Sequence, residues 1–262
     1  MQIKAAHLFI FICTLSCKEK ANSKSKQADF NSKPIQPSKR SATALQILDI
    51  PLPEGYSRQQ NTENSFADWL QQIALKNDNT VFYYNGEVKP NQQAQYAVLD
   101  ISVGKQNLQQ CADAVMRLRA EYLFYTKQYS TIVFFDNDKK RYAFEMPYTE
   151  ENLAIYLKKV FGMCGTASLS KQMQKITYNQ VQAGDVLIRG GFPGHAVIVM
   201  DVAVNEDGKK IFLLAQSYMP AQDVHVLQNP MVDDISPWYF LNDAEYINTP
   251  EYTFNRNEWK TW

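Results

Sequence analysis

Residues 184–218 read GDVLIRGGFPGHAVIVMDVAVNEDGKKIFLLAQSY and contain three apolar runs separated by two turn signals. The first turn is the Gly/Pro-rich GGFPG at 190–194, and the second is the Asp-Gly pair at 207–208. Turns of these compositions connect neighbouring antiparallel strands. The stretch therefore predicts three consecutive strands of an antiparallel sheet.

The residues before this stretch predict helices and hairpins. Helical spacing and capping residues predict helices at 64–75, 107–125 and 149–162, with Asn64 or Ser65, Asn107 and Thr149 as N-caps. Runs of β-branched and aromatic residues predict hairpins at 80–88 and 131–144 and a strand at 95–104. Helices followed by an antiparallel sheet indicate an α+β fold.

The N-terminus has the pattern of a secretory signal. One lysine precedes an apolar stretch at 5–15, which is too short to cross a bilayer as a mature helix. The sequence TLSC at 14–17 resembles the lipobox of bacterial lipoproteins, which implies that residues 1–17 are a lipoprotein signal peptide and that Cys17 carries the lipid. An ordinary signal peptide that contains a cysteine is the alternative.

Residues 18–44 are rich in Lys, Ser and Pro and nearly devoid of apolar residues, which predicts a disordered tether. Residues 45–262 then form a single α+β domain. We expect the lipid on Cys17 to hold the protein on a membrane of the cell envelope, either at the periplasmic face or at the cell surface.

Composition excludes several classes of partner. The formal net charge is zero, and because the tether is basic, the domain is mildly acidic, which argues against nucleic acid. The GGFPG turn lacks the Lys-Ser/Thr and the following helix of a phosphate-binding loop, so no nucleotide is expected. The cysteines and histidines form no short-range pairs, so we expect no metal site and no cofactor.

A cysteine, a histidine and a glutamine are placed as a thiol hydrolase requires. Cys111 lies at the beginning of a predicted helix, where the helix dipole favours a thiolate. His195 opens a predicted strand, and Gln216 lies on the next strand. These residues suit the roles of nucleophile, base and orienting group.

Each of these residues also has a plainer interpretation. Cys111 continues an apolar helix stripe, so it can be a core residue, or it can form a disulfide with Cys164. A two-residue turn at 207–208 places Gln216 opposite Val199, about 13 Å along the strand from His195. Ser217, Tyr218 and Gln222 are rivals for the orienting role, and His225 is expected to face solvent.

Two arginines share the Cys111 helix. Arg117 and Glu121 are four residues apart, which favours an ion pair on the helix surface. Alternatively, Arg117 and Arg119 hold a carboxylate of a peptide substrate, with Tyr218 as a further substrate contact.

The segment GDVLIRGGFPGHAVIV at 184–199 resembles the corresponding strands of papain-like NlpC-type and CHAP cell-wall peptidases. The resemblance implies a papain-like arrangement of helices packed on an antiparallel sheet. It also implies Cys111 as nucleophile, His195 as base and Gln216 as the residue that orients the base, although QQCADAV around Cys111 differs from the usual context of that nucleophile.

A second resemblance covers nearly everything after residue 45. The segments PLPEGYSR, QQCADAVMRLRAEYL, CGTASLSK, GGFPGHAVIVMDVA, LLAQSYMPAQD and SPWYF resemble a bacterial family described as domain of unknown function number 4846. The family description implies no chemistry.

The sequence thus leads to two hypotheses. The first is a lipid-anchored envelope enzyme, a cysteine amidase or peptidase that acts on peptidoglycan peptides or other amide bonds. The second is a lipoprotein of the same fold that binds or scaffolds without catalysis, for which the many Tyr and Trp side chains suit glycan or protein contacts.

Overall fold

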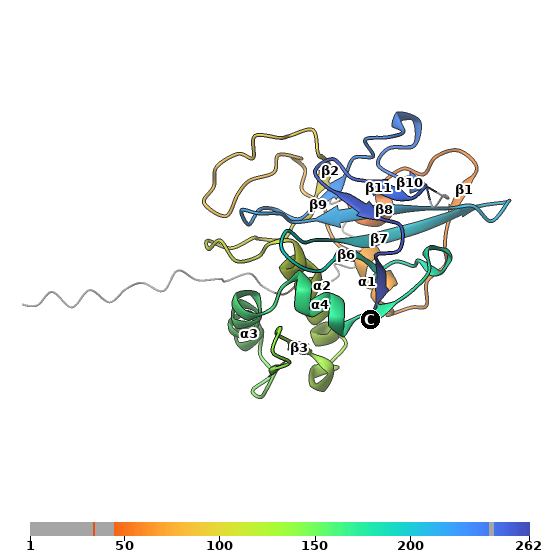
Figure 1. Cartoon of the computed structure of the whole chain (residues 1–262). Coiled ribbons are helices and arrows are strands. Elements are labelled where there is room, and N and C mark those ends of the chain that lie inside the picture. Colours follow the sequence, from red (N-terminus) through yellow and green to blue (C-terminus); the bar gives the residue numbers. More distant parts are fainter. Residues whose placement is uncertain (1–33, 35–44, 241–243) are drawn as a thin grey trace, which may run out of the picture.

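A nine-stranded antiparallel sheet dominates the computed structural model, which describes residue 34, residues 45–240 and residues 244–262 (Figure 1). Seven strands follow one another in the order β2, β9, β8, β7, β6, β13 and β5, while β1 pairs with β7 and β10 pairs with β8. The strands of this sheet are β1 Tyr56–Arg58, β2 Gln95–Val98, β5 Gln174–Lys175, β6 Val186–Arg189, β7 His195–Asn205, β8 Lys210–Gln216, β9 His225–Leu227, β10 Tyr239–Phe240 and β13 Trp259–Thr261.

Residues 184–218 form the centre of this sheet. The three predicted strands are confirmed as β6, β7 and β8, which pair in sequence order. The Gly/Pro turn between β6 and β7 packs closely against the rest of the protein. A Cβ atom on Gly194 would lie 2.4 Å from Oγ1 of Thr166 and 2.5 Å from the backbone oxygen of Gly191. Only glycine therefore allows β7 to begin at this place.

The register between β7 and β8 differs from the one that a two-residue turn predicts. Val204 pairs with Lys210, and beyond a bulge near Met200 the pairing is Ile198 with Ala215. The longer turn and the bulge each shift the register by one residue. The end of β8 therefore lies two residues, or about 7 Å, nearer to the start of β7 than the predicted register places it.

The described residues contain four α-helices: α1 Phe66–Gln71, α2 Cys111–Tyr125, α3 Glu150–Met163 and α4 Thr166–Gln172. In Figure 1, α1, α2 and α4 lie on one side of the sheet, and α3 lies farther from it. Single turns of 3-10 helix occur at Ile47–Asp49, Tyr129–Thr131, Tyr178–Gln180 and Asp233–Ile235.

Two of the predicted N-caps are confirmed and one is wrong. Ser65 accepts a hydrogen bond from the backbone N–H of Asp68, and Thr149 accepts one from Asn152. Helix α2, in contrast, begins at Cys111 with Gln110 as its N-cap. The predicted cap, Asn107, instead accepts a hydrogen bond from the backbone N–H of Ala221 at 2.8 Å. The side chain that the local sequence predicts as a helix cap thus makes a tertiary hydrogen bond instead.

Two small hairpins complete the described secondary structure. Strands β3 Val133–Phe135 and β4 Arg141–Ala143 form the hairpin predicted at 131–144, and β11 Tyr246–Asn248 pairs with β12 Thr253–Asn255. The predicted hairpin at 80–88 is reduced to an isolated bridge between Phe82 and Val88.

Both faces of the sheet are covered by apolar side chains. On the helix side, Ile198 and Met200 belong to a large buried cluster with Trp69 and Leu118. On the other side, Val197 and Val199 belong to a smaller cluster. The smaller cluster also contains Phe212, Leu214, Phe254 and Trp259. Burial on both faces explains why the central strands are nearly continuous apolar runs.

The predicted fold class, an α+β protein with a papain-like arrangement of helices and sheet, is wrong. The structure is mostly β, and α1 and α4 have only six and seven residues. The resemblance depended on residues 184–199, which form β6, a turn and the start of β7. Such a pair of strands is compatible with many antiparallel sheets, so it does not determine how the helices are arranged around it. The predicted signal peptide at 1–17, with Cys17, and all of the tether at 18–44 except Pro34 lie outside the described residues.

Candidate functional site

The first contact of the site joins the ends of two neighbouring strands. His195 is the first residue of β7 and Gln216 is the last residue of β8. Nε2 of His195 lies 2.7 Å from Oε1 of Gln216, and both side chains are only 2% exposed. The shifted register brings these two residues together.

The amide of Gln216 is oriented by two further contacts. Its Nε2 donates to Oε2 of Glu251 at 2.8 Å and lies 3.4 Å from Nε2 of His225. The Nδ1–H of His225 donates to the backbone oxygen of Asp223 at 2.9 Å, so its Nε2 is an acceptor. With both amide hydrogens in use, only the oxygen of Gln216 can face His195. Nε2 of His195 therefore carries the proton, and its Nδ1 carries the lone pair.

A partly buried ion pair lies behind Gln216. Nζ of Lys89 is 2.6 Å from Oε2 of Glu251, the same oxygen that accepts from Gln216. Lys89 is 3% exposed, and burial lowers its pKa while the contact with Glu251 opposes that shift. Four residues from four separate segments of the chain thus form one connected polar network: Lys89, His195, Gln216 and Glu251.

Cys111 is the first residue of α2 and lies beside the start of β7. It lies near Ala196, the residue that directly follows His195. The residue is 7% exposed. Burial, followed by the nearby Asp113 carboxyl, raises the pKa of the thiol to about 11. The helix N-terminus therefore does not produce a thiolate here, because desolvation outweighs it.

The imidazole of His195 is neutral as well. Burial lowers its pKa to about 4, the hydrogen bond with Gln216 opposes this shift, and the charge of Lys89 reinforces it. At neutral pH the site therefore holds a protonated thiol and a neutral imidazole instead of an ion pair.

Aromatic rings cover His195. The ring centroids of Tyr218, Tyr252 and Phe254 lie 4.5, 5.0 and 5.7 Å from that of His195. Tyr218 and Tyr252 are partly exposed, whereas Phe254 is fully buried. The two tyrosines therefore separate the histidine from solvent.

A glutamine just before α2 has a donor without a partner among the described residues. Gln109 is fully buried, and its Oε1 accepts from Nη1 of Arg117. Its backbone oxygen accepts from Ser217, next to Gln216. Within the described part of the chain, Nε2 of Gln109 has no hydrogen-bond partner. A buried N–H without a partner is a donor available to an incoming acceptor.

The two arginines lie in different environments. The Arg117–Glu121 pair forms at 2.7 Å, but both side chains are 1–2% exposed, so the predicted surface location is wrong. Nη1 of Arg117 also donates to the backbone oxygen of Ser102, which ties the loop before α2 to the helix. Arg119 stacks on Phe66 and Trp262 at 5.1 and 5.2 Å from their ring centroids. It lines a pocket of about 390 Å³ there.

Two further expectations are corrected. His225 is fully buried, so the predicted solvent-facing position is wrong, because β9 is covered on both faces. Cys111 and Cys164 are both free thiols, so the alternative disulfide is not formed. Cys164, at the end of α3, is also buried, and burial raises the pKa of its thiol to about 12.

Sequence reasoning identified His195, Gln216 and Cys111 but not the groups around them. Glu251, Lys89, Tyr252 and Phe254 come from segments without any motif, and only folding brings them to β7. Among the residues that the structure describes, no group of three or more His, Cys, Asp or Glu side chains is arranged to hold a metal ion. In the same ranges no helix is sufficiently long and apolar to span a membrane.

The family model described as domain of unknown function (4846) matches residues 48–149 and 137–261. No curated protein and no solved structure matches the chain.

Proposed function

Given that the chain belongs to the family described as domain of unknown function (4846), we propose that it is a cysteine-dependent hydrolase that cleaves amide bonds with its own side chains at the start of β7. Cys111 is the nucleophile, His195 is the base, and Gln216 orients the base. The substrate is a peptide amide, with the stem peptides of peptidoglycan as the first candidate. A lipid on Cys17 holds the enzyme in the cell envelope.

One observation carries this proposal. The 2.7 Å contact between Nε2 of His195 and Oε1 of Gln216 leaves Nδ1 as the only basic nitrogen of the ring. Glu251 and His225 keep the amide in that orientation. A neutral imidazole with one fixed tautomer has a free nitrogen that can accept a proton, as a general base must.

The reaction begins from the neutral pair. The Cys111 thiol gives its proton to Nδ1 of His195 as the sulfur attacks the carbonyl carbon of the amide. The proton then passes from Nδ1 to the amide nitrogen, the C–N bond breaks, and the amine leaves. Water, deprotonated by His195, attacks the resulting thioester and releases a carboxylic acid and the free thiol.

The start of α2 supplies donors for the developing oxyanion. Backbone N–H groups at Cys111 and Ala112 lie at the positive end of the helix, and Gln109 adds its unpaired Nε2. Because Tyr218 and Tyr252 cover His195, substrate entry requires these rings to move. Tyr218 is the substrate contact nearest to the imidazole.

A second candidate function is a binding or scaffolding lipoprotein without catalysis. The observation in its favour is the burial of Cys111, whose thiol pKa is raised to about 11. A buried cysteine with this pKa is inert in the resting protein. In that case the His195–Gln216–Glu251 network is a stabilising part of the core.

Incubation of purified peptidoglycan with the full-length protein in detergent tests the proposal. We expect mass spectrometry to detect new amine and carboxyl ends in the stem peptides. Cys111→Ala should abolish their formation, and His195→Ala should reduce the rate by about 10²–10⁴-fold. Cys164→Ala is the matched control, because it removes the other buried thiol of the described chain and should retain activity.

The outcomes separate the two candidates. Product formation that survives Cys111→Ala excludes this nucleophile. If the wild-type protein forms no product from peptidoglycan or from a mixed peptide library, the hydrolase proposal fails and the binding function remains.

A further inference from the structure

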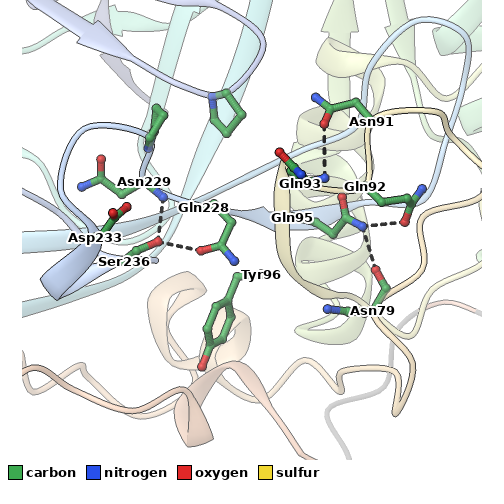
Figure 2. Close-up of a pocket in the computed structure, with 12 residues that line it drawn as sticks. Asn79, Asn91, Gln92, Gln93, Gln95, Tyr96, Gln228, Asn229, Asp233 and Ser236 are labelled. Carbon is green, nitrogen blue, oxygen red and sulfur yellow. Dashed lines mark hydrogen bonds between the residues drawn. The ribbon is translucent and has the colours of Figure 1, made fainter.

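A pocket of about 810 Å³ lies at the edge of the sheet where β2 is the outer strand, and none of the residues of the His195 site lines it. Its volume falls within the usual range of small-molecule sites, roughly 300–1,000 Å³. Its walls come from the loop before β2, from β2 itself and from the segment after β9 (Figure 2). The residues that line it are Asn79, Asn91, Gln92, Gln93, Gln95, Tyr96, Gln228, Asn229, Pro230, Asp233, Ser236 and Pro250.

The lining is dominated by carboxamides. Seven of the twelve residues are Asn or Gln, and among the described residues Asp233 is the only ionisable acid and no Lys or Arg lines the pocket. Each carboxamide both donates and accepts hydrogen bonds without carrying a charge. The lining therefore suits a neutral ligand with many hydroxyl or amide groups and not a phosphate or a carboxylate.

Gln95 on β2 provides an acceptor that no other described residue uses. Its side chain is 3% exposed, and its Nε2 donates to the backbone oxygen of Asn79 at 3.0 Å and to Oε1 of Gln92 at 2.6 Å. Its Oε1 has no hydrogen-bond partner within the described part of the chain. A buried acceptor without a partner is unfavourable, so a ligand hydroxyl that reaches it would stabilise the complex.

The opposite wall is held in place by its own hydrogen bonds. Oγ of Ser236 donates to Oε1 of Gln228 at 2.6 Å and accepts from the backbone N–H of Asn229 at 3.0 Å. The side chain of Asn229 donates to the backbone oxygen of Trp238 at 2.8 Å. Figure 2 shows these groups on one side of the pocket and Gln92, Gln93 and Gln95 on the other. Such preorganised polar groups lose little entropy when a ligand binds.

We propose that this pocket binds a short neutral oligosaccharide. Carboxamides on both walls match the hydroxyl and acetamido groups of pyranose rings, and Tyr96 offers an aromatic ring for their apolar faces. A peptide suits the pocket less well. Peptide-binding grooves rely on apolar side-chain pockets, whereas the carbon-rich groups here are limited, in the described lining, to Tyr96, Pro230 and Pro250.

The pocket adjoins the His195 network without depending on it. Nδ2 of Asn91 donates to Oε1 of Glu251 at 3.2 Å, and Glu251 in turn accepts from Gln216. Saccharide binding is measured without turnover, so this proposal can fail or succeed independently of the hydrolase.

Titration of the full-length protein with chitotetraose, followed by isothermal calorimetry and by NMR of side-chain amides, tests the pocket. We expect saturable binding that shifts Asn and Gln side-chain signals. Tyr96→Ala should weaken binding roughly tenfold, while Tyr96→Phe, which keeps the ring, should retain most of it. Tyr125→Ala is the matched control, because this tyrosine lies at the end of α2 and is 45% exposed.

Gln93→Ala is a second pocket variant that should fold normally, because Gln93 is exposed. It therefore separates a loss of binding from a folding defect. We expect it to weaken binding several-fold while circular dichroism stays unchanged. Three results would overturn the proposal: no saturable binding of chitotetraose, cellotetraose or maltotetraose; binding unaffected by both Tyr96→Ala and Gln93→Ala; or saturable binding of an uncharged tetrapeptide alone.

Discussion

At the scale of single residues, burial decides the chemistry of the site. Cys111 and His195 both stay neutral at pH 7, because desolvation raises the pKa of the thiol to about 11 and lowers that of the imidazole to about 4. The tautomer of His195 is set by Gln216, whose amide is oriented by Glu251. The proposed nucleophile is therefore activated only when a substrate enters and the base takes its proton.

The ring of Tyr218, which covers His195, should limit the access of reagents to the Cys111 thiol. Tyr218→Ala should increase the rate of iodoacetamide alkylation of Cys111 at pH 7.5 by roughly tenfold, because solvent and reagent gain access to the buried thiol. Mass spectrometry of the labelled peptides measures the rate at Cys111 separately from that at Cys164. Tyr246→Ala, at a position 50% exposed on β11, should leave the rate unchanged. An unchanged rate in Tyr218→Ala itself would show that this ring does not close the site.

At the scale of elements, the start of α2 combines a buried thiol with a buried acid. Oδ2 of Asp113 accepts from the backbone N–H of Gln110 at 2.9 Å and so caps the helix. Burial nevertheless raises the pKa of Asp113 to about 8, and the cap opposes that shift only in part. A carboxyl that remains protonated in the folded state contributes stability below pH 4, and this contribution is lost as the pH rises toward 8.

Asp113→Asn should therefore change how stability depends on pH. The variant keeps a cap acceptor but no ionisable group, so its stability relative to wild type should increase from pH 4 to 8, by up to about 1.4 kcal/mol per pH unit. Urea unfolding at pH 5, 6, 7 and 8 measures the difference. Asp207→Asn, in the exposed turn between β7 and β8, is the control. A difference between Asp113→Asn and wild type that is constant across this range would contradict the raised pKa.

At the scale of the whole molecule, the sheet joins distant parts of the chain. β13, near the C-terminal end, lies between β6 and β5, and β2 pairs with β9. Trp259, the first residue of β13, is fully buried in the cluster on the sheet face opposite the helices. Its ring meets that of Phe212 edge-on, with the ring centroids 5.3 Å apart. The last strand therefore closes one face of the core.

Trp259→Ala should lower the free energy of unfolding by about 3–5 kcal/mol, because it opens a large cavity in that face. Trp262→Ala should cost clearly less, since Trp262 is only partly buried and packs on Arg119. Urea denaturation followed by circular dichroism measures both variants. Equal losses for the two tryptophans would mean that β13 is not part of the core.

Sequence patterns alone predict the central strands, the Thr149 cap, a cap at either Asn64 or Ser65, and the residues Cys111, His195 and Gln216 as candidates. Local patterns suffice there, because strand periodicity, turn residues and capping residues act over a few positions. The sequence did not determine the arrangement of helices and sheet, because residues 184–199 specify only a pair of strands and a turn.

The contact between Gln216 and His195 depends on the tertiary structure. The longer turn and the bulge near Met200 shift the register so that Gln216 contacts His195. The pattern of apolar residues does not predict either irregularity. Lys89, Glu251 and Tyr252 lie at the site because long-range contacts bring their loops close to β7 and β8. Burial of Cys111, Asp113 and His225 depends on what packs over them, and that packing, not residue type, sets their charge.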